Sequence, residues 1–359
     1  MRALTKWLAA GTIAAALIGP VAANAASFGF GGEQYPKVGK PALFDPAADH
    51  SADTGFLWVN APDGAKGVKK VVIPFFQVQF VTESDASAMA RGGATSDTLM
   101  MLKGPTPEQM QAMTDALYDN LVTQLQAAGL EVVGIDQAKT YPAYAAIMAD
   151  AKPSGAEVKG MGKVTSSFYA PHGMGFYLLP TTLPEYSGGG NFAVMGNQGN
   201  VRHEGELLDQ SGAAVLGFRA VVDFAKMKSS DNTFDGHNHI FIWTGGKAGV
   251  AVPPISTQMF LLTPAAKGTM MDPQNRMRIE VQQPLMIDSG AITSVDNSTT
   301  GGQKLGSVAG SVFGVMSGTG LHITQQYDVN VDPKVWQTDV QGAIAGVEAA
   351  MVGKLKAGL

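Results

Sequence analysis

The clearest periodic pattern in the chain starts at Thr106. Thr106 and Gln109 form a Thr-x-x-Gln capping box around Pro107, a residue suited to the first helical position. Gly129 then provides a left-handed C-terminal cap. The spacing predicts an amphipathic helix over residues 107–128. Its apolar stripe consists of Met110, Met113, Leu117, Leu121 and Leu125.

A second helix is predicted over residues 333–355. Asp332 is suited to cap it and Pro333 to start it. Its apolar stripe consists of Trp336, Val340, Ile344, Val347, Met351 and Leu355. Glycines weaken a helix interior, so the glycines of this helix indicate a close approach, which we expect to be to a sheet. They are Gly342, Gly346 and Gly353.

Runs rich in β-branched and aromatic residues flank the first helix. Residues 71–81 predict a strand interrupted by Pro74, and residues 130–135 predict another. A strand, a helix and a second strand with a glycine exit form an open α/β unit. The Ser-, Ala- and Gly-rich stretch between the first strand and the helix is expected to be an exposed loop.

The part of the chain between the two helices is mostly strand-like. The candidate strands are residues 213–227, 239–243, 258–262, 277–287 and 322–331. Two glycine-rich, polar stretches, near 184–200 and 296–314, predict loops or hairpin tips. We therefore expect a single domain of α/β (α+β) class, with an antiparallel-rich mixed sheet and helices packed on it near both ends of the chain.

The first residues have the pattern of an export signal. Arg2 and Lys6 precede a short apolar run, and small residues at Ala23 and Ala25 suit a cleavage site. The pattern predicts a cleaved signal peptide over 1–25, an extended leader over 26–67 and the α/β domain over 68–359. We expect the protein to be periplasmic or associated with the outer membrane, with no transmembrane segment after cleavage.

Composition narrows the possible functions. The chain has no cysteine, which excludes disulfides, thiolate metal sites and cysteine nucleophiles. The formal net charge is −5, so the chain lacks the basic surface that nucleic acid or anionic membranes require. We expect no nucleic-acid partner and no cofactor.

The order of these elements resembles the curli-secretion-channel superfamily and is similar to the amino-terminal domain of the periplasmic Tol-system translocation protein. The resemblance covers residues 68–136, 210–226 and 277–355. The features that carry it are the strand end at Phe75 and Phe76, the helix with Asp115, Leu117, Leu121 and Leu125, its exit at residues 129–133, the strand from Gly212, and the turn at Ser289 and Gly290.

This resemblance concerns structure and carries no catalytic residues. The lipid-anchor cysteine typical of the channel-forming members is absent. The resemblance therefore implies a periplasmic, non-enzymatic component of an envelope assembly, with an envelope protein or a second copy as its partner.

One histidine pair is a candidate metal site. Asp235, His237 and His239 lie two residues apart, so on a strand they would share a face, and two histidines with a carboxylate can hold zinc or iron. The alternative is a turn at Asp235 followed by a strand whose polar face carries the two histidines. A strand's period pairs the histidines but cannot surround a metal, so we expect the cluster to be structural.

Other histidines offer little support for a metal. His203 with Glu204, and His322, are the plausible distant donors, but no pattern brings them near the pair. His172 is expected to lie in a loop and His50 in a polar leader. The chain has no nucleophile elbow, phosphate loop, dinucleotide fingerprint or zincin helix.

The sequence thus favours a non-enzymatic periplasmic or envelope component that is structural or binding in character and forms part of an assembly. Two alternatives stay open. One is a metal-dependent enzyme centred on His237 and His239. The other is a carrier of a small apolar ligand, for which the 18 methionines are permissive.

Overall fold

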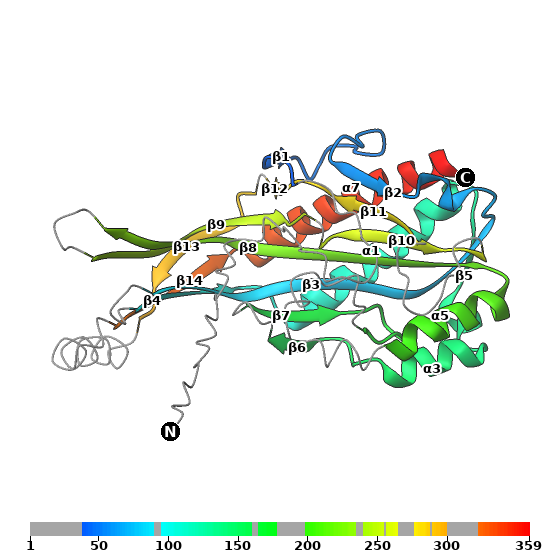
Figure 1. Cartoon of the computed structure of the whole chain (residues 1–359), viewed down its shortest axis with the longest axis horizontal. Helices are drawn as coiled ribbons and strands as arrows, with labels where there is room; N and C mark the ends of the chain where they lie inside the picture. Colours follow the sequence, from blue (N-terminus) through cyan, green and yellow to red (C-terminus); the bar gives the residue numbers. More distant parts are fainter. Residues whose placement is uncertain are drawn as a thin grey trace, which may run out of the picture.

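The computed structural model describes residues 38–89, 95–159, 164–177, 198–234, 240–254, 256–264, 276–287, 289–299 and 322–359. In these residues a mixed sheet of 14 strands carries helices on both faces (Figure 1). Nine of the 13 strand pairings are antiparallel. The α/β class and the antiparallel-rich mixed sheet are confirmed.

The strands are β1 (Ala42–Phe44), β2 (Leu57–Asn60), β3 (Lys70–Met89), β4 (Thr95–Lys103), β5 (Glu131–Val133), β6 (Ala156–Lys159), β7 (Val164–Tyr169), β8 (Ala214–Phe234), β9 (Ile240–Val252), β10 (Gln258–Leu262), β11 (Met277–Val281), β12 (Leu285–Ile287), β13 (Ile292–Asn297) and β14 (His322–Val331). The helices are η1 (Pro62–Ala65), α1 (Pro107–Ala127), α2 (Ile135–Ala138), α3 (Pro142–Asp150), α5 (Gln198–Ser211) and α7 (Pro333–Gly358).

The main path of the sheet runs β1-β12-β9-β8-β3-β4-β14-β13, and its centre is the parallel pair β3 and β8. Shorter strands branch from this pair: β7 and β5 pair with β3, and β10 pairs with β8. The expected interruption at Pro74 is a shift in the β3–β8 register between Val72 and Phe75, where the strand continues. A bulge accommodates proline because the residue there need not donate to the ladder.

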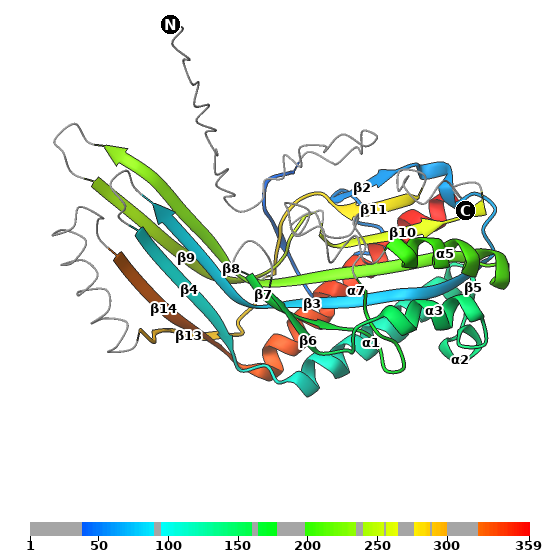
Figure 2. The ribbon, with the colours of Figure 1, turned by 60° about the horizontal axis from the view of Figure 1, so that its bottom comes forward.

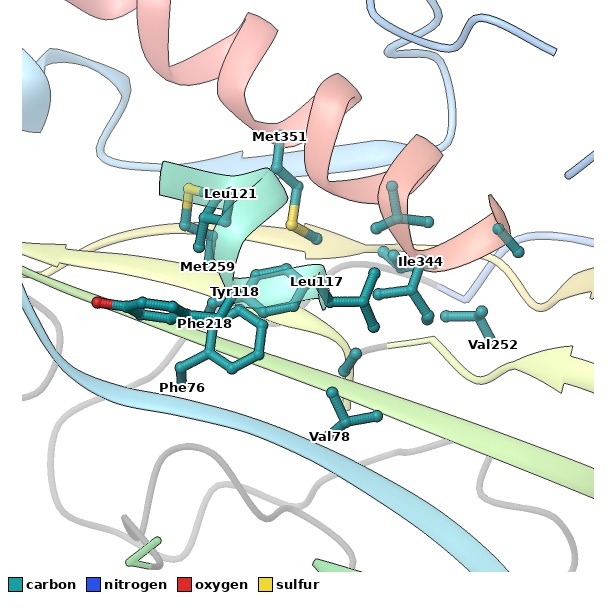
Figure 3. Close-up of a cluster of buried hydrophobic side chains, with 14 of the residues drawn as sticks. Phe76, Val78, Leu117, Tyr118, Leu121, Phe218, Val252, Met259, Ile344 and Met351 are labelled. Atoms are coloured by element: carbon teal, nitrogen blue, oxygen red, sulfur yellow. The ribbon is translucent and has the colours of Figure 1, made fainter. Parts of the chain in front are cut away.

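The predicted helix at residues 107–128 is confirmed as α1. The Thr106 hydroxyl accepts from the Gln109 amide at 3.2 Å, and the Gln109 side chain accepts from the Thr106 amide at 3.0 Å. Its stripe is buried, and Leu117 and Leu121 are fully covered. With α7 beside it, α1 covers one face of the sheet, where Phe76 and Phe218 stack at 5.2 Å under the two helices (Figure 3). We call this layer the helix-side core.

The helix predicted at residues 333–355 is α7. Its glycines do make a close approach, but to the N-terminal segment of residues 44–62 more than to the sheet. A Cβ at Gly342 would lie 2.5 Å from the Pro46 carbonyl oxygen, and one at Gly353 would lie 2.6 Å from that of Ser51. Only glycine lets that segment approach the helix so closely.

Residues 38–67, assigned from the sequence to an extended leader, contain β1, β2 and η1. Phe44 and Phe56 are each 3 % exposed and meet edge-on at 5.5 Å. The Phe44 ring also stacks on His50 at 3.8 Å. This part of the chain is therefore integral to the helix-side core. The signal peptide of 1–25 and the leader up to residue 37 lie outside the described residues.

The stretch between the first strand and α1, expected as a loop, is largely strand. β3 continues to Met89, and β4 returns along it in antiparallel pairing from Thr95 to Met101. β8 and β9 form a second long antiparallel pair. The glycine-rich stretches near 184–200 and 296–314 fall mostly outside the described residues, although α5 begins at Gln198 and β13 ends at Asn297.

In the residues that the structure describes, no helix combines the length and the apolar composition needed to cross a membrane.

The opposite face of the sheet has its own apolar cluster, under α3 and α5. Val72, Phe75 and Phe260 belong to it, because side chains alternate between faces along a strand. Gly217 of β8 lies between its strand partners Phe75 and Phe260, whose ring centroids are 5.5 Å apart. A Cβ at Gly217 would be 2.0 Å from the Phe260 ring.

We therefore expect Gly217→Ala to lower the free energy of unfolding by about 3 kcal/mol, at the upper end of the usual effect of overpacking a core. The control is Gly249→Ala in β9, where the new Cβ would meet only the Met286 methyl at 3.5 Å. Chemical denaturation of both variants checks this. Equal losses would contradict the close packing of Phe260 on Gly217.

Candidate functional site

The proposed metal ligands Asp235, His237 and His239 lie outside the described residues, and β9 begins immediately after them at Ile240. The two histidines therefore stay a prediction. Of the expected distant donors, His322 is the first residue of β14, and His203 and Glu204 lie on α5. In the described part of the chain, no three His, Asp or Glu side chains converge as a metal site would require.

His203 and Glu204 have other partners. The His203 imidazole lies 2.7 Å from the Glu206 carboxylate, one turn along α5. Glu204 is fully buried and points into the protein. Both residues are thus explained by contacts of α5 itself and of the core beneath it.

A row of buried polar side chains crosses the sheet face that lies opposite α1 and α7. Strand register places Gln77 of β3 beside Arg219 of β8, then Gln258 of β10, then Glu280 of β11. We call these four residues, with the flanking Gln79 and Arg278, the polar row. All six are at most 2 % exposed. Charged and amide groups are seldom buried so completely unless they are paired.

Side chains of the polar row bind each other and nearby strands. Arg219 donates to the Gln79 carbonyl oxygen, and the Gln79 amide donates to the Ser166 hydroxyl at 2.9 Å. On β11, the Arg278 guanidinium lies 3.3 Å from the Glu280 carboxylate. It also lies 5.8 Å from the centre of the Trp58 ring. The row is therefore a network internal to the sheet.

Gln77 differs from its neighbours, because no described residue provides a hydrogen-bond partner for either atom of its amide. Burying an amide without hydrogen bonds costs free energy. Gln77 lies beside Arg219, its partner on β8. A register slip of one residue would turn Gln77 and Arg219 into the helix-side core, where no polar row exists to receive them. The row therefore makes the alignment of β3 with β8 specific.

A second buried network joins α5 to the same sheet face. The Glu204 carboxylate accepts from the Tyr177 hydroxyl at 2.7 Å and from the Arg276 guanidinium. Arg276 lies 5.5 Å from the centre of the Phe260 ring. Burial, and then the nearby Glu204 carboxylate, raise the pKa of Tyr177 well above its usual value, so its hydroxyl remains a donor. Glu204 thus accepts from both Tyr177 and Arg276 and joins them in one buried network.

On the surface, His172 forms a pair with Asp115 of α1. The backbone amide of His172 donates to one carboxylate oxygen at 2.8 Å, and its Nδ1 lies 2.5 Å from the other. The nearby Ser154 hydroxyl donates to Gln111 at 2.6 Å instead of approaching the imidazole. As expected, His172 lies in a loop, which follows β7. In the described part of the chain, no nucleophile contacts the pair as a catalytic triad would require.

A groove of about 370 Å³ lies where α1 meets β5 and α2. Tyr118 and Val122 line its floor together with Ile135, while Asp119 and Asp136 also line it. The lining is mixed, because apolar side chains that include Val132 stand beside the two carboxylates.

No protein-family model matches the chain, and neither the curated proteins nor the solved structures include a significant match. The functional reading therefore depends on the geometry of the chain itself.

The polar row was not predicted, although the sequence contains a signal for it. Gln77 and Gln79 alternate with Val78 and Phe80 in an otherwise apolar strand, and Arg278 and Glu280 alternate in the same way. A polar period of two inside apolar strands indicates that one face of the sheet is polar.

We expect Glu204→Gln to destabilise the protein by about 3 kcal/mol, because it leaves the buried Arg276 guanidinium without a counter-charge. The matched control on the same helix is Glu206→Gln, whose partners Arg202 and His203 are partly exposed. It should change stability much less than Glu204→Gln does, because solvent screens exposed ion pairs. Urea denaturation measures both, and a harmless Glu204→Gln would contradict the network.

Proposed function

We propose that the protein is a non-enzymatic structural or binding subunit of an assembly in the periplasm or cell envelope. The observation that carries this proposal is a set of strand segments that we call the sheet extension. It consists of residues 83–89 of β3, 95–101 of β4, 223–234 of β8, 240–251 of β9 and the part of β14 that pairs with β4. Figure 2 shows these strands projecting together beyond the ends of α1 and α7.

The strands of the extension are unusually long. β3 contains 20 residues and β8 contains 21, against the roughly 3–10 of strands in most globular proteins. At about 3.3 Å per residue, each spans about 65–70 Å. A layer of helices covers only part of that length, so the extension supplies a surface larger than this domain needs for its own core.

The ends of the sheet supply a second argument. The main path ends at β1 and β13, and an edge strand presents backbone groups that can pair with another chain. Large apolar side chains are exposed on both: Leu43 of β1 is 80 % exposed and Val295 of β13 is 46 % exposed. Edges of this kind support association through strands.

The polar groups support a structural role over catalysis. The polar row and the network of Glu204, Tyr177 and Arg276 are buried, and these side chains, apart from Gln77, contact one another or adjacent strands. Location in the envelope rests on the export-signal pattern of residues 1–25 and on the resemblance to envelope proteins.

The test is the size of the protein purified from envelope extracts, measured by light scattering, with co-purifying proteins identified. We expect an oligomer or a stable complex. Val295→Lys should reduce the associated fraction at least tenfold, because a charge on an edge strand opposes strand pairing.

The matched control is Val335→Lys, since Val335 is 39 % exposed but lies on α7. It should leave association unchanged. A monomer without partners in both soluble and membrane extracts would overturn the proposal, as would equal loss of association in the two variants.

A further inference from the structure

Glu348 is an acidic residue in the wrong environment for a charge. It lies on α7 and is 0 % exposed, on the side of the helix that meets α1. The layer around it is apolar: Figure 3 shows Ile344 and Met351 of α7 close to Leu117 and Leu121 of α1. An ionised carboxylate there would have to give up its hydration with little in return.

Two buried side-chain oxygens, one on α7 and one on α1, receive no hydrogen bond from the described residues. The Asn120 side-chain amide donates to Oε2 of Glu348 at 2.8 Å. The other carboxyl oxygen, Oε1, is buried and receives no hydrogen bond from the described residues. The same is true of Oε1 of Gln124, which also lies on α1.

Helical periodicity places Gln124 on the face of α1 that carries Asn120, the residue that binds Glu348. Gln124 follows Asn120 by one helical turn, so both side chains lie on one face of the helix. Long side chains on a helix lean toward its N-terminus, which carries the Gln124 amide back toward the residue that Asn120 binds.

We propose that Glu348 carries a proton and that its Oε1–H donates to Oε1 of Gln124, which makes a proton-dependent latch between α1 and α7. A carboxylic acid has one donor that a carboxylate lacks. A single proton therefore neutralises the buried charge and satisfies both unpaired oxygens.

No charged neighbour opposes this assignment. Burial raises the pKa of Glu348 well above its usual value, and the Asn120 hydrogen bond only partly counteracts that effect. No charged group in the described residues contributes to the shift. The nearest acidic residues along α1 are engaged elsewhere: Asp115 binds His172, and Asp119 lines the groove beside α2.

The latch makes stability depend on pH in a defined direction. The folded protein keeps a proton that the unfolded chain releases above a pH of about 4.3. Stability is therefore greatest below that pH and is lost as pH rises through the elevated folded pKa. In that interval the unfolding equilibrium constant should increase by up to tenfold per pH unit.

Asp223 must be removed from the comparison, because burial also raises its pKa, to about 6, and it would titrate in the same direction. The experiment therefore uses an Asp223→Asn background. The unfolding constant is measured from pH 4 to 9 with and without Glu348→Gln, with amide exchange of α1 and α7 as a local readout.

Glutamine is neutral at every pH and offers an amide donor to Gln124. We expect Glu348→Gln to remove the pH slope, to strengthen folding above neutral pH, and to slow amide exchange in α1 and α7 there. The control Glu157→Gln changes an exposed acid on β6 and should leave the slope intact.

A second variant tests the partner. Gln124→Leu should weaken folding at pH 5, and a double-mutant cycle with Glu348→Leu, which removes the carboxyl donor, should show that the two sites are coupled. An unchanged slope in Glu348→Gln, a Glu348→Gln variant that does not fold, or independent effects of the two sites would overturn the latch.

Discussion

The parallel pairing of β3 with β8 is the constraint on which the rest of the structure depends. These two strands lie at the centre of the sheet, and every other layer is built against one of their faces. Their alternating side chains send Phe76 and Phe218 toward α1 and α7, and Gln77 and Arg219 to the opposite face. Because the two faces are chemically different, the pairing tolerates one register only.

The two faces of the sheet also differ in the kinds of residue that they bury. The helix-side core is mainly apolar, with Thr114, His50 and Glu348 among its few buried polar residues, whereas the opposite face holds arginines, glutamates and glutamines under full burial. Buried ionic networks add little net stability compared with apolar packing but penalise alternatives severely. The polar row therefore fixes the register of β3 and β8 at the centre of the sheet, and the extension continues these two strands in that register.

The sequence was sufficient for elements with strong local signals. α1 has a capping box and a stripe, α7 has an Asp-Pro start, and β10 and β14 have the predicted bounds of residues 258–262 and 322–331. β4 was missed because "TSDTLMMLK" has little intrinsic strand preference and is held by pairing with β3 and β14.

The buried networks were missed for a related reason. α5 follows a glycine-rich stretch, and Glu204 resembles any surface acid until Tyr177 and Arg276 are brought to it from distant parts of the chain. Glu348 likewise looks like the exposed position of a helix. Sequence periodicity identifies a buried face by its apolar residues, so it cannot identify a polar residue that belongs there.

The glycine contacts of α7 have a consequence for the order of folding. The last helix of the sequence packs through Gly342 and Gly353 on the carbonyls of Pro46 and Ser51, about 300 residues earlier, so these contacts close a very long loop. Contacts between such distant segments slow folding. The helix-side core therefore cannot be completed until residues from both ends of the domain have met.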